Sequence, residues 1–140
     1  MVYVALQVLL CQGIEQGIRS YSLLHGVNTA EANKALFLEA NRDSALDAIE
    51  EEFKGRIAGI YIENLPTYKI VVRVKGYGQN EKRNIVVGNA ISKGDLPIDI
   101  QYGAKESREE AISQINKALK LVKNYFYTIQ TVSYNEKMGI

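Results

Sequence analysis

The stretch GRIAGIYIENLPTYKIVVRVKG, residues 55–76, contains two runs in which apolar residues recur at alternate positions. In the second run, residues 68–74, apolar side chains largely alternate with basic ones, which is typical of a strand with one buried face. The first run, residues 57–62, is apolar on both sides, so we expect a more central strand. The five residues between them, ENLPT, have a length and composition suited to a hairpin loop. The stretch therefore predicts an antiparallel β-hairpin.

The sequence on both sides of this hairpin predicts helices. NTAE at residues 28–31 has the form of a capping box, and apolar residues then recur at three- and four-residue steps as far as Phe53. This spacing predicts one helix or two. SREE at residues 107–110 is a second capping box. It precedes a helix whose expected apolar face is formed by Ile112, Ile115, Leu119, Val122 and Phe126.

Three shorter segments, residues 84–88, 97–102 and 128–134, predict further strands, and residues 89–96 predict a loop. The expected fold is α+β: a small antiparallel sheet with helices packed on one face, preceded by an N-terminal helical segment. We divide the chain into an N-terminal helix or signal-like segment, residues 1–25, and an α+β domain, residues 26–140. The residues expected to be buried together are Ile60, Ile62, Ile70, Val72, Ile112, Ile115 and Leu119.

The N-terminal segment has two interpretations, and the residues leave both open. Val2–Leu10 is apolar enough to be a short signal-peptide core, and the small residues around Cys11–Gly13 fit a cleavage site. However, no Lys or Arg precedes the apolar run, which favours a buried amphipathic helix or a start inside a longer chain. No run reaches the roughly 18 apolar residues that a membrane span needs.

The composition argues against several classes of function. Seventeen Lys and Arg against sixteen Asp and Glu leave a net charge of +1, whereas nonspecific nucleic-acid binding needs a clustered basic surface. One cysteine, Cys11, excludes an intrachain disulfide and a cysteine-rich zinc site. One histidine, His25, excludes a site built from several histidines. We therefore expect no bound metal and no cofactor.

The sequence also contains no motif that predicts an enzyme. His25 precedes Gly26 at an apparent helix end, where a histidine more often interacts with the last carbonyl groups than acts as a base. The glycine-rich GYGQN, residues 76–80, lacks the lysine of a phosphate-binding loop, and it predicts a mobile turn between strands. The paired carboxylates fall in helix ends and loops, where burial does not separate their pKa values. A hydrolase that uses His25 is the weakest alternative.

Nine tyrosines, several of them on or beside strand segments, form the one unusual feature of the composition. An apolar ring with a polar tip suits half-exposed positions of a sheet, and it equally suits a binding surface. Pairing between neighbouring strands accounts for most of these positions. The functional alternative is a sheet surface or edge that binds a protein or peptide. The predicted partner-binding residues are Tyr61, Tyr68, Tyr102 and Tyr134.

The hairpin and its flanking segments resemble a known family. GRIAGIYIENLPTYKIVVRVKG follows VNTAEANKALFLEANRDSALDAIEEEF and precedes DLPIDIQYGAKESREEAISQINKAL. Together these segments resemble the propeptide-type domains of bacterial secreted chymotrypsin-like serine proteases, namely the alpha-lytic protease and streptogrisin precursors. The resemblance covers residues 26–134. Its motifs are structural rather than chemical.

The resemblance implies a non-enzymatic protein-binding module that inhibits a protease or assists its folding. The implied partner is a chymotrypsin-like serine protease, and the implied location is extracytoplasmic, either periplasmic or secreted. The implied mode of binding is a sheet edge that pairs with a protease hairpin. The alternative is a structural or self-associating domain of a bacterial envelope protein. Neither alternative includes binding to nucleic acid or a membrane span.

Overall fold

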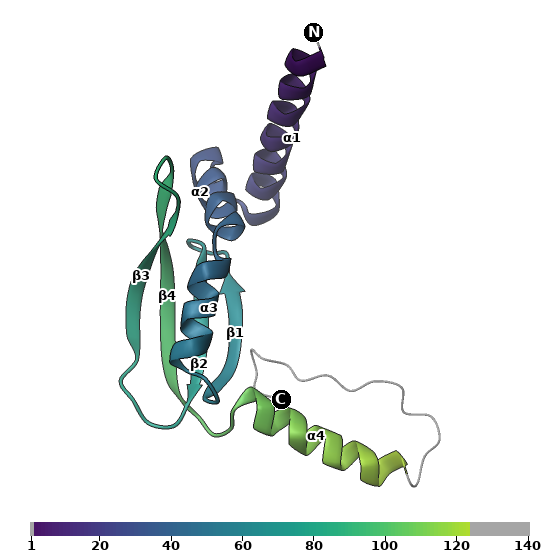
Figure 1. The fold of residues 1–140 in the computed structure, drawn as a ribbon, viewed down its shortest axis with the longest axis vertical. Helices are drawn as coiled ribbons and strands as arrows, with labels where there is room; N and C mark the ends of the chain where they lie inside the picture. Colours follow the sequence, from purple (N-terminus) through teal and green to yellow (C-terminus); the bar gives the residue numbers. More distant parts are fainter. Residues whose placement is uncertain (1, 124–140) are drawn as a thin grey trace.

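The computed structural model describes residues 2–123, with side chains from residue 12 onward. Helices α2 and α3 lie over one face of the sheet, whereas α1 and α4 extend away from its two ends (Figure 1). The α+β class and the N-terminal helix are thus confirmed. The elements are α1 (Val2–His25), α2 (Thr29–Ala40), α3 (Asp43–Glu52), β1 (Ile57–Glu63), β2 (Lys69–Lys75), β3 (Glu81–Gly88), β4 (Lys93–Ala104) and α4 (Arg108–Lys123).

The four described strands have the order β1-β2-β4-β3. The predicted hairpin is confirmed, because β1 pairs with β2 in antiparallel fashion and Ile62 lies opposite Ile70. β3 and β4 form a second antiparallel pair, but β2 and β4 are parallel, so the sheet is mixed rather than wholly antiparallel as predicted. The physical reason is the apolar content of β4. Its side chains at Leu96, Ile98 and Ile100 are fully buried, which places β4 in the centre of the sheet and leaves polar β3 outside.

The β3–β4 hairpin is longer than the sequence predicted. The loop expected over residues 89–96 occupies only 89–92, and residues 93–96 belong to β4. The turn is closed by Asn89, whose Oδ1 accepts hydrogen bonds from the amides of Ile91 (2.9 Å) and Ser92 (3.0 Å). Gly94 looked like a loop residue, but it lies inside the strand. A larger residue would be crowded at this position, because an added Cβ would lie 3.0 Å from the ring of Phe37.

The core lies between the sheet and the helix pair α2 and α3. The predicted cap of α2 is confirmed, since the Glu31 amide donates to Asn28 Oδ1 at 2.8 Å. The helical region between residues 28 and 53 is divided in two, with a break at Asn41 and Arg42. Burial of Ile70 and Val72 is also confirmed. They pack in one cluster with Leu38, Ala45, Ile49, Phe53, Ile57, Val74, Leu96, Ile98 and Ile100.

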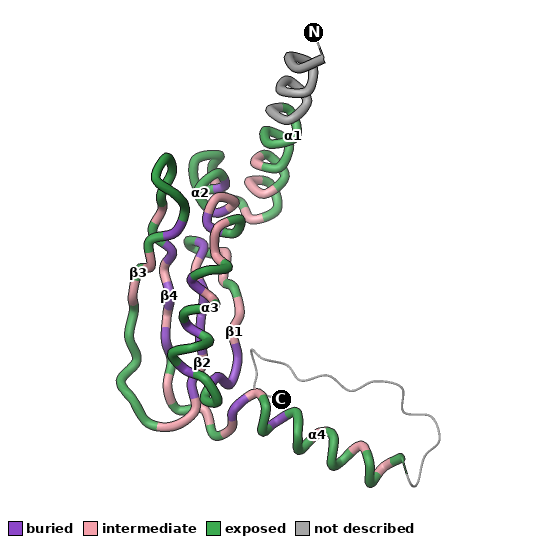
Figure 2. Tube along the Cα trace, viewed as in Figure 1, coloured by how far each residue is buried: buried purple, intermediate pink, exposed green. Residues whose placement is uncertain are grey.

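The prediction that α4 covers the sheet is wrong. Ala111 is its only buried residue in the described range, and Ile112 is 42% exposed. The helix extends away from the sheet because α2 and α3 already cover the face that it was expected to occupy (Figure 2). Predicted core residues Ile115 and Leu119 are half-buried on α4, and Ile62 on β1 is 38% exposed. Phe126 and the strand predicted over residues 128–134 lie outside the described residues.

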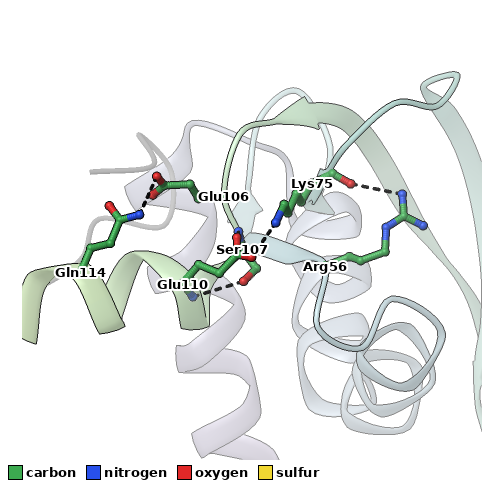
Figure 3. A network of polar contacts seen from close by, with 6 residues as sticks. All are labelled: Arg56, Lys75, Glu106, Ser107, Glu110 and Gln114. Carbon is green, nitrogen blue, oxygen red and sulfur yellow. Dashed lines mark hydrogen bonds and ion pairs between the residues drawn. The ribbon is translucent and has the colours of Figure 1, made fainter.

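Polar contacts attach the start of α4 to the sheet (Figure 3). The predicted capping box is confirmed: the Ser107 amide donates to Glu110 Oε2 at 2.9 Å, and the Glu110 amide donates to Ser107 Oγ at 3.2 Å. The Lys75 ammonium group on β2 donates to Glu110 Oε1 at 2.5 Å. One carboxylate therefore both closes the helix cap and fixes the helix to the sheet.

Candidate protein-binding edge

β3 is an outer strand of the described sheet and its most exposed one (Figure 2). Within residues 2–123 it pairs only with β4. Most of its residues are exposed, and Val87 is the one buried residue of the strand. The outer strand on the opposite side differs, because β1 begins with buried Ile57 and Ala58. β3 is therefore the more exposed of the two outer strands in the described sheet.

The hairpin turn determines which backbone groups of β3 point outward. The Asn89 amide donates to the Ser92 carbonyl at 2.8 Å, so these two residues form a hydrogen-bonded pair. In an antiparallel ladder such pairs alternate with pairs that do not bond. Odd-numbered residues of β3 therefore bond to β4. The N–H and C=O groups that point away from the sheet belong to Lys82, Asn84 and Val86.

Three exposed apolar side chains lie along this edge. Tyr77 precedes β3, Val86 lies within it and Ile91 follows it in the turn. The Tyr77 side chain is fully exposed, and the exposed fractions of Val86 and Ile91 are 63% and 96%. A strand of this length extends for about 26 Å at roughly 3.3 Å per residue. We define the β3 edge as Tyr77, Lys82, Asn84, Val86 and Ile91.

The loop that presents Tyr77 is held against the sheet. Gly78 packs on the ring of Tyr102, and a Cβ at this glycine would lie 2.5 Å from a ring carbon. The Asn80 side chain accepts a hydrogen bond from the Tyr102 amide at 2.8 Å. Tyr77 is thus an aromatic side chain on a fixed loop, which is the kind of residue that anchors protein interfaces.

The sequence does not indicate Tyr77 as a binding residue, because GYGQN predicts a mobile turn, whereas the structure holds this loop against Tyr102. The available signal was a tyrosine between two glycines. Such a segment approaches its neighbours closely while its one large side chain points outward.

Arg83 fastens β3 to α3 on the helix-covered face, away from the exposed edge. Its guanidinium group donates to Glu52 Oε2 at 2.7 Å and to Glu52 Oε1 at 3.0 Å, and it also contacts Glu81. The guanidinium carbon lies 5.8 Å from the centre of the Phe53 ring. The hydrogen bond from Arg83 holds the pKa of Glu52 below its ordinary value. This bidentate pair fixes the strand without covering its outward backbone groups.

The pair predicts a pH dependence of stability. Because the Glu52 pKa is lower in the folded chain, its ionised form stabilises the fold above the unfolded pKa of about 4.3, and this contribution is lost as the pH falls through the folded value. We expect Glu52→Gln to lower the urea midpoint at pH 7 and to have a smaller effect at pH 3. Urea titrations at both pH values measure this difference. An equal loss at both would show that the Glu52 charge contributes nothing.

The three predicted partner-binding tyrosines that the structure describes do not form one surface. Tyr68 is buried, and its hydroxyl group accepts a hydrogen bond from Arg42 at 2.9 Å. Tyr102 is half-buried on the helix-covered face, where its ring lies edge-on to Phe53 at 6.2 Å. Tyr61 is half-buried on the opposite face of β1. Tyr134 lies outside the described residues.

The other features that the sequence singled out lie on different elements of the described structure. His25 is half-buried at the end of α1, and its ring lies 4.3 Å from that of Tyr21. Among residues 12–123, whose side chains the structure describes, no three His, Cys, Asp or Glu side chains gather as metal ligands. A groove of about 390 Å³ between α3 and α4 is lined mainly by charged side chains of both signs. Small-molecule sites, by contrast, are lined mostly by apolar groups. None of the described helices is long and apolar enough to cross a membrane.

Comparisons with models of known families, with characterised proteins and with solved structures give no match for this chain.

Proposed function

We propose that this chain is a non-enzymatic protein-binding module that receives an extended segment of its partner beside β3. The observation that carries the proposal is the set of outward backbone groups at Lys82, Asn84 and Val86. An outer strand with unpaired N–H and C=O groups is a template for a further strand. Binding of this kind needs no catalytic motif, since main-chain hydrogen bonds supply the affinity.

The side chains of β3 favour an edge that binds a partner strand over an edge that is protected from pairing. Natural sheets often protect an edge with charged residues, proline or a bulge. Here the charged residues Glu81, Lys82 and Arg83 occupy the start of β3, whereas the later half presents Val86 as an exposed apolar side chain. Tyr77 and Ile91 would contact a bound segment at its two ends. Tyr77 takes the place of buried Tyr68 in the proposed contact surface.

The first partner to test is a chymotrypsin-like serine protease of an extracytoplasmic system. Support for this choice comes from the resemblance of the hairpin and its flanking segments to protease propeptide domains. Inhibition and folding assistance both require that the domain bind the protease surface, and an open sheet edge suits that task. The alternative remains a structural or self-associating domain of an envelope protein, which would use the same edge.

A proline at Asn84 tests the proposed edge. Proline removes the outward N–H group and no ladder bond to β4, so Asn84→Pro should fold. We expect its binding to catalytically inactive alpha-lytic protease to weaken about tenfold or more, because an unpaired acceptor in the interface costs about 1–3 kcal/mol. Asn84→Ala is the matched control, since it removes the same side chain and keeps the N–H group. Calorimetry measures binding, and far-ultraviolet circular dichroism checks the fold.

The two outcomes that contradict the proposal are distinct. If folded Asn84→Pro binds the protease as tightly as Asn84→Ala does, the β3 edge is not the binding site. If the parent chain does not bind, the protease assignment is wrong.

A further inference from the structure

We infer that the β3 edge is self-complementary and that a second copy of this chain occupies it in the absence of another partner. Two copies would pair antiparallel about a two-fold axis at Asn84 and form one continuous sheet. The inference rests on the proposed function, because it uses the same outward backbone groups. It adds the identity of one occupant and a means of regulating the edge.

The backbone fits this arrangement. A two-fold axis at Asn84 places Lys82 of each copy opposite Val86 of the other, and the two Asn84 residues opposite each other. All three residues with outward groups then form hydrogen-bonded pairs. Moving the register by two residues in one direction would pair Lys82 with Gly88, whose φ of +105° departs from an extended strand. Moving it in the other direction would leave Val86 outside the ladder.

The side chains opposite one another are also compatible. The aliphatic part of Lys82 would lie beside exposed Val86, and the two Asn84 amides can hydrogen-bond to each other. On the other face, Arg83 of one copy would lie opposite Ile85 of the second. No two like charges stand directly opposite each other in this register, which is the arrangement that destabilises a strand pair.

The most exposed apolar residues of the edge fit an antiparallel pairing of the two copies. Tyr77 precedes β3, and Ile91 follows it in the turn. The two-fold axis therefore brings Tyr77 of each copy towards Ile91 of the other. Both side chains are almost completely exposed in the single chain. Their contact at both ends of the paired strands would remove four large apolar groups from water.

Such a dimer would conceal the edge from other partners. A partner protein would bind only the fraction of the chain that is monomeric, so its apparent affinity would fall as the concentration of this chain rises. Self-association and binding of a partner would then be mutually exclusive.

Charge reversal at the paired positions tests the register. We expect the parent chain to sediment as a reversible dimer at micromolar to millimolar concentrations. Val86→Lys places lysine opposite Lys82 of the second copy, twice by symmetry, and should weaken the dimer about tenfold. Adding Lys82→Glu to Val86→Lys restores opposite charges and should return the dissociation constant to within about threefold of the parent value. The matched control is Leu121→Lys, an exposed apolar residue on α4 that should have no effect.

Three results would overturn the inference: a parent chain that stays monomeric, a Val86→Lys variant that dimerises as the parent does, or a double variant whose dimer is not restored. The same experiments distinguish failure of this inference from failure of the proposed function. If the parent is monomeric but Asn84→Pro loses protease binding, the edge binds a partner and does not pair with itself. If charge reversal restores the dimer but no protease binds, self-pairing stands and the protease assignment falls.

Discussion

Replacement of Ile70 by alanine is expected to lower the free energy of unfolding by about 2–5 kcal/mol, as large-to-small changes in a close-packed core do. Ile70 is fully buried in β2, between Ile62 of β1 and Ile98 of β4. The space left by the removed atoms cannot collapse, because both neighbouring strands are held by backbone ladders. Urea unfolding of the two proteins gives the difference directly.

Ile112→Ala is the control for this prediction. Ile112 lies on the same kind of helical apolar face that the sequence placed in the core, but the structure leaves it 42% exposed on α4. We expect its replacement to cost less than about 1 kcal/mol, in the range of partly exposed sites. Comparable losses for Ile70→Ala and Ile112→Ala would mean that α4 packs on the sheet after all.

The second large effect is expected at Gly88, the last residue of β3. Its φ is +105°, and an added Cβ would lie 2.2 Å from the Ser92 carbonyl oxygen and 3.0 Å from the Phe37 ring. A strained backbone alone costs about 1–3 kcal/mol, and the clash with Ser92 must in addition displace the turn. Gly88→Ala should therefore lower the urea midpoint strongly and weaken every interaction of the β3 edge.

Gly26→Ala separates the two causes. Gly26 also has a positive φ, +65°, but an added Cβ there meets no atom within 4 Å. We expect it to cost only the conformational penalty of about 1–2 kcal/mol. If the two alanine variants lose equal stability, the close approach between Gly88 and Ser92 does not exist in solution.

Local patterns in the sequence predicted those elements that depend on neighbouring residues. The alternation around Ile70 predicted β2, and the capping boxes at Asn28 and Ser107 predicted the starts of two helices. All three are confirmed, since a cap or a two-residue period is encoded within a few positions. The same local reasoning identified β3 as a strand and underestimated its length, because its first half is polar.

The direction of strand pairing and the contacts of α4 depend on tertiary packing, which these local patterns do not predict. Nothing in residues 97–102 says whether the segment pairs parallel or antiparallel with β2, because alternation looks the same in both. Likewise, the apolar spacing of Ile112, Ile115 and Leu119 predicts a helix with an apolar face, but it does not say what that face contacts. Because α2 and α3 already cover one face of the sheet, α4 does not pack on that face (Figure 1).

The sequence predicted the type of candidate site but not its position. The sequence indicated a sheet edge rather than a catalytic centre, and left open which edge. The structure favours β3 because most of its residues are exposed, whereas β1 begins with buried Ile57 and Ala58. The composition directed attention to tyrosines in strands, whereas Tyr77, which is fully exposed, lies in a glycine loop.

Amide hydrogen exchange along β3 tests the central claim most directly. In a dilute, monomeric sample, the account predicts slow exchange at Arg83, Ile85 and Val87, whose N–H groups bond to β4. It predicts fast exchange at Lys82, Asn84 and Val86, which becomes slow when inactive alpha-lytic protease is added to saturation. Slow exchange at every position of dilute β3, or fast exchange at the three outward positions in the protease-bound chain, would contradict it.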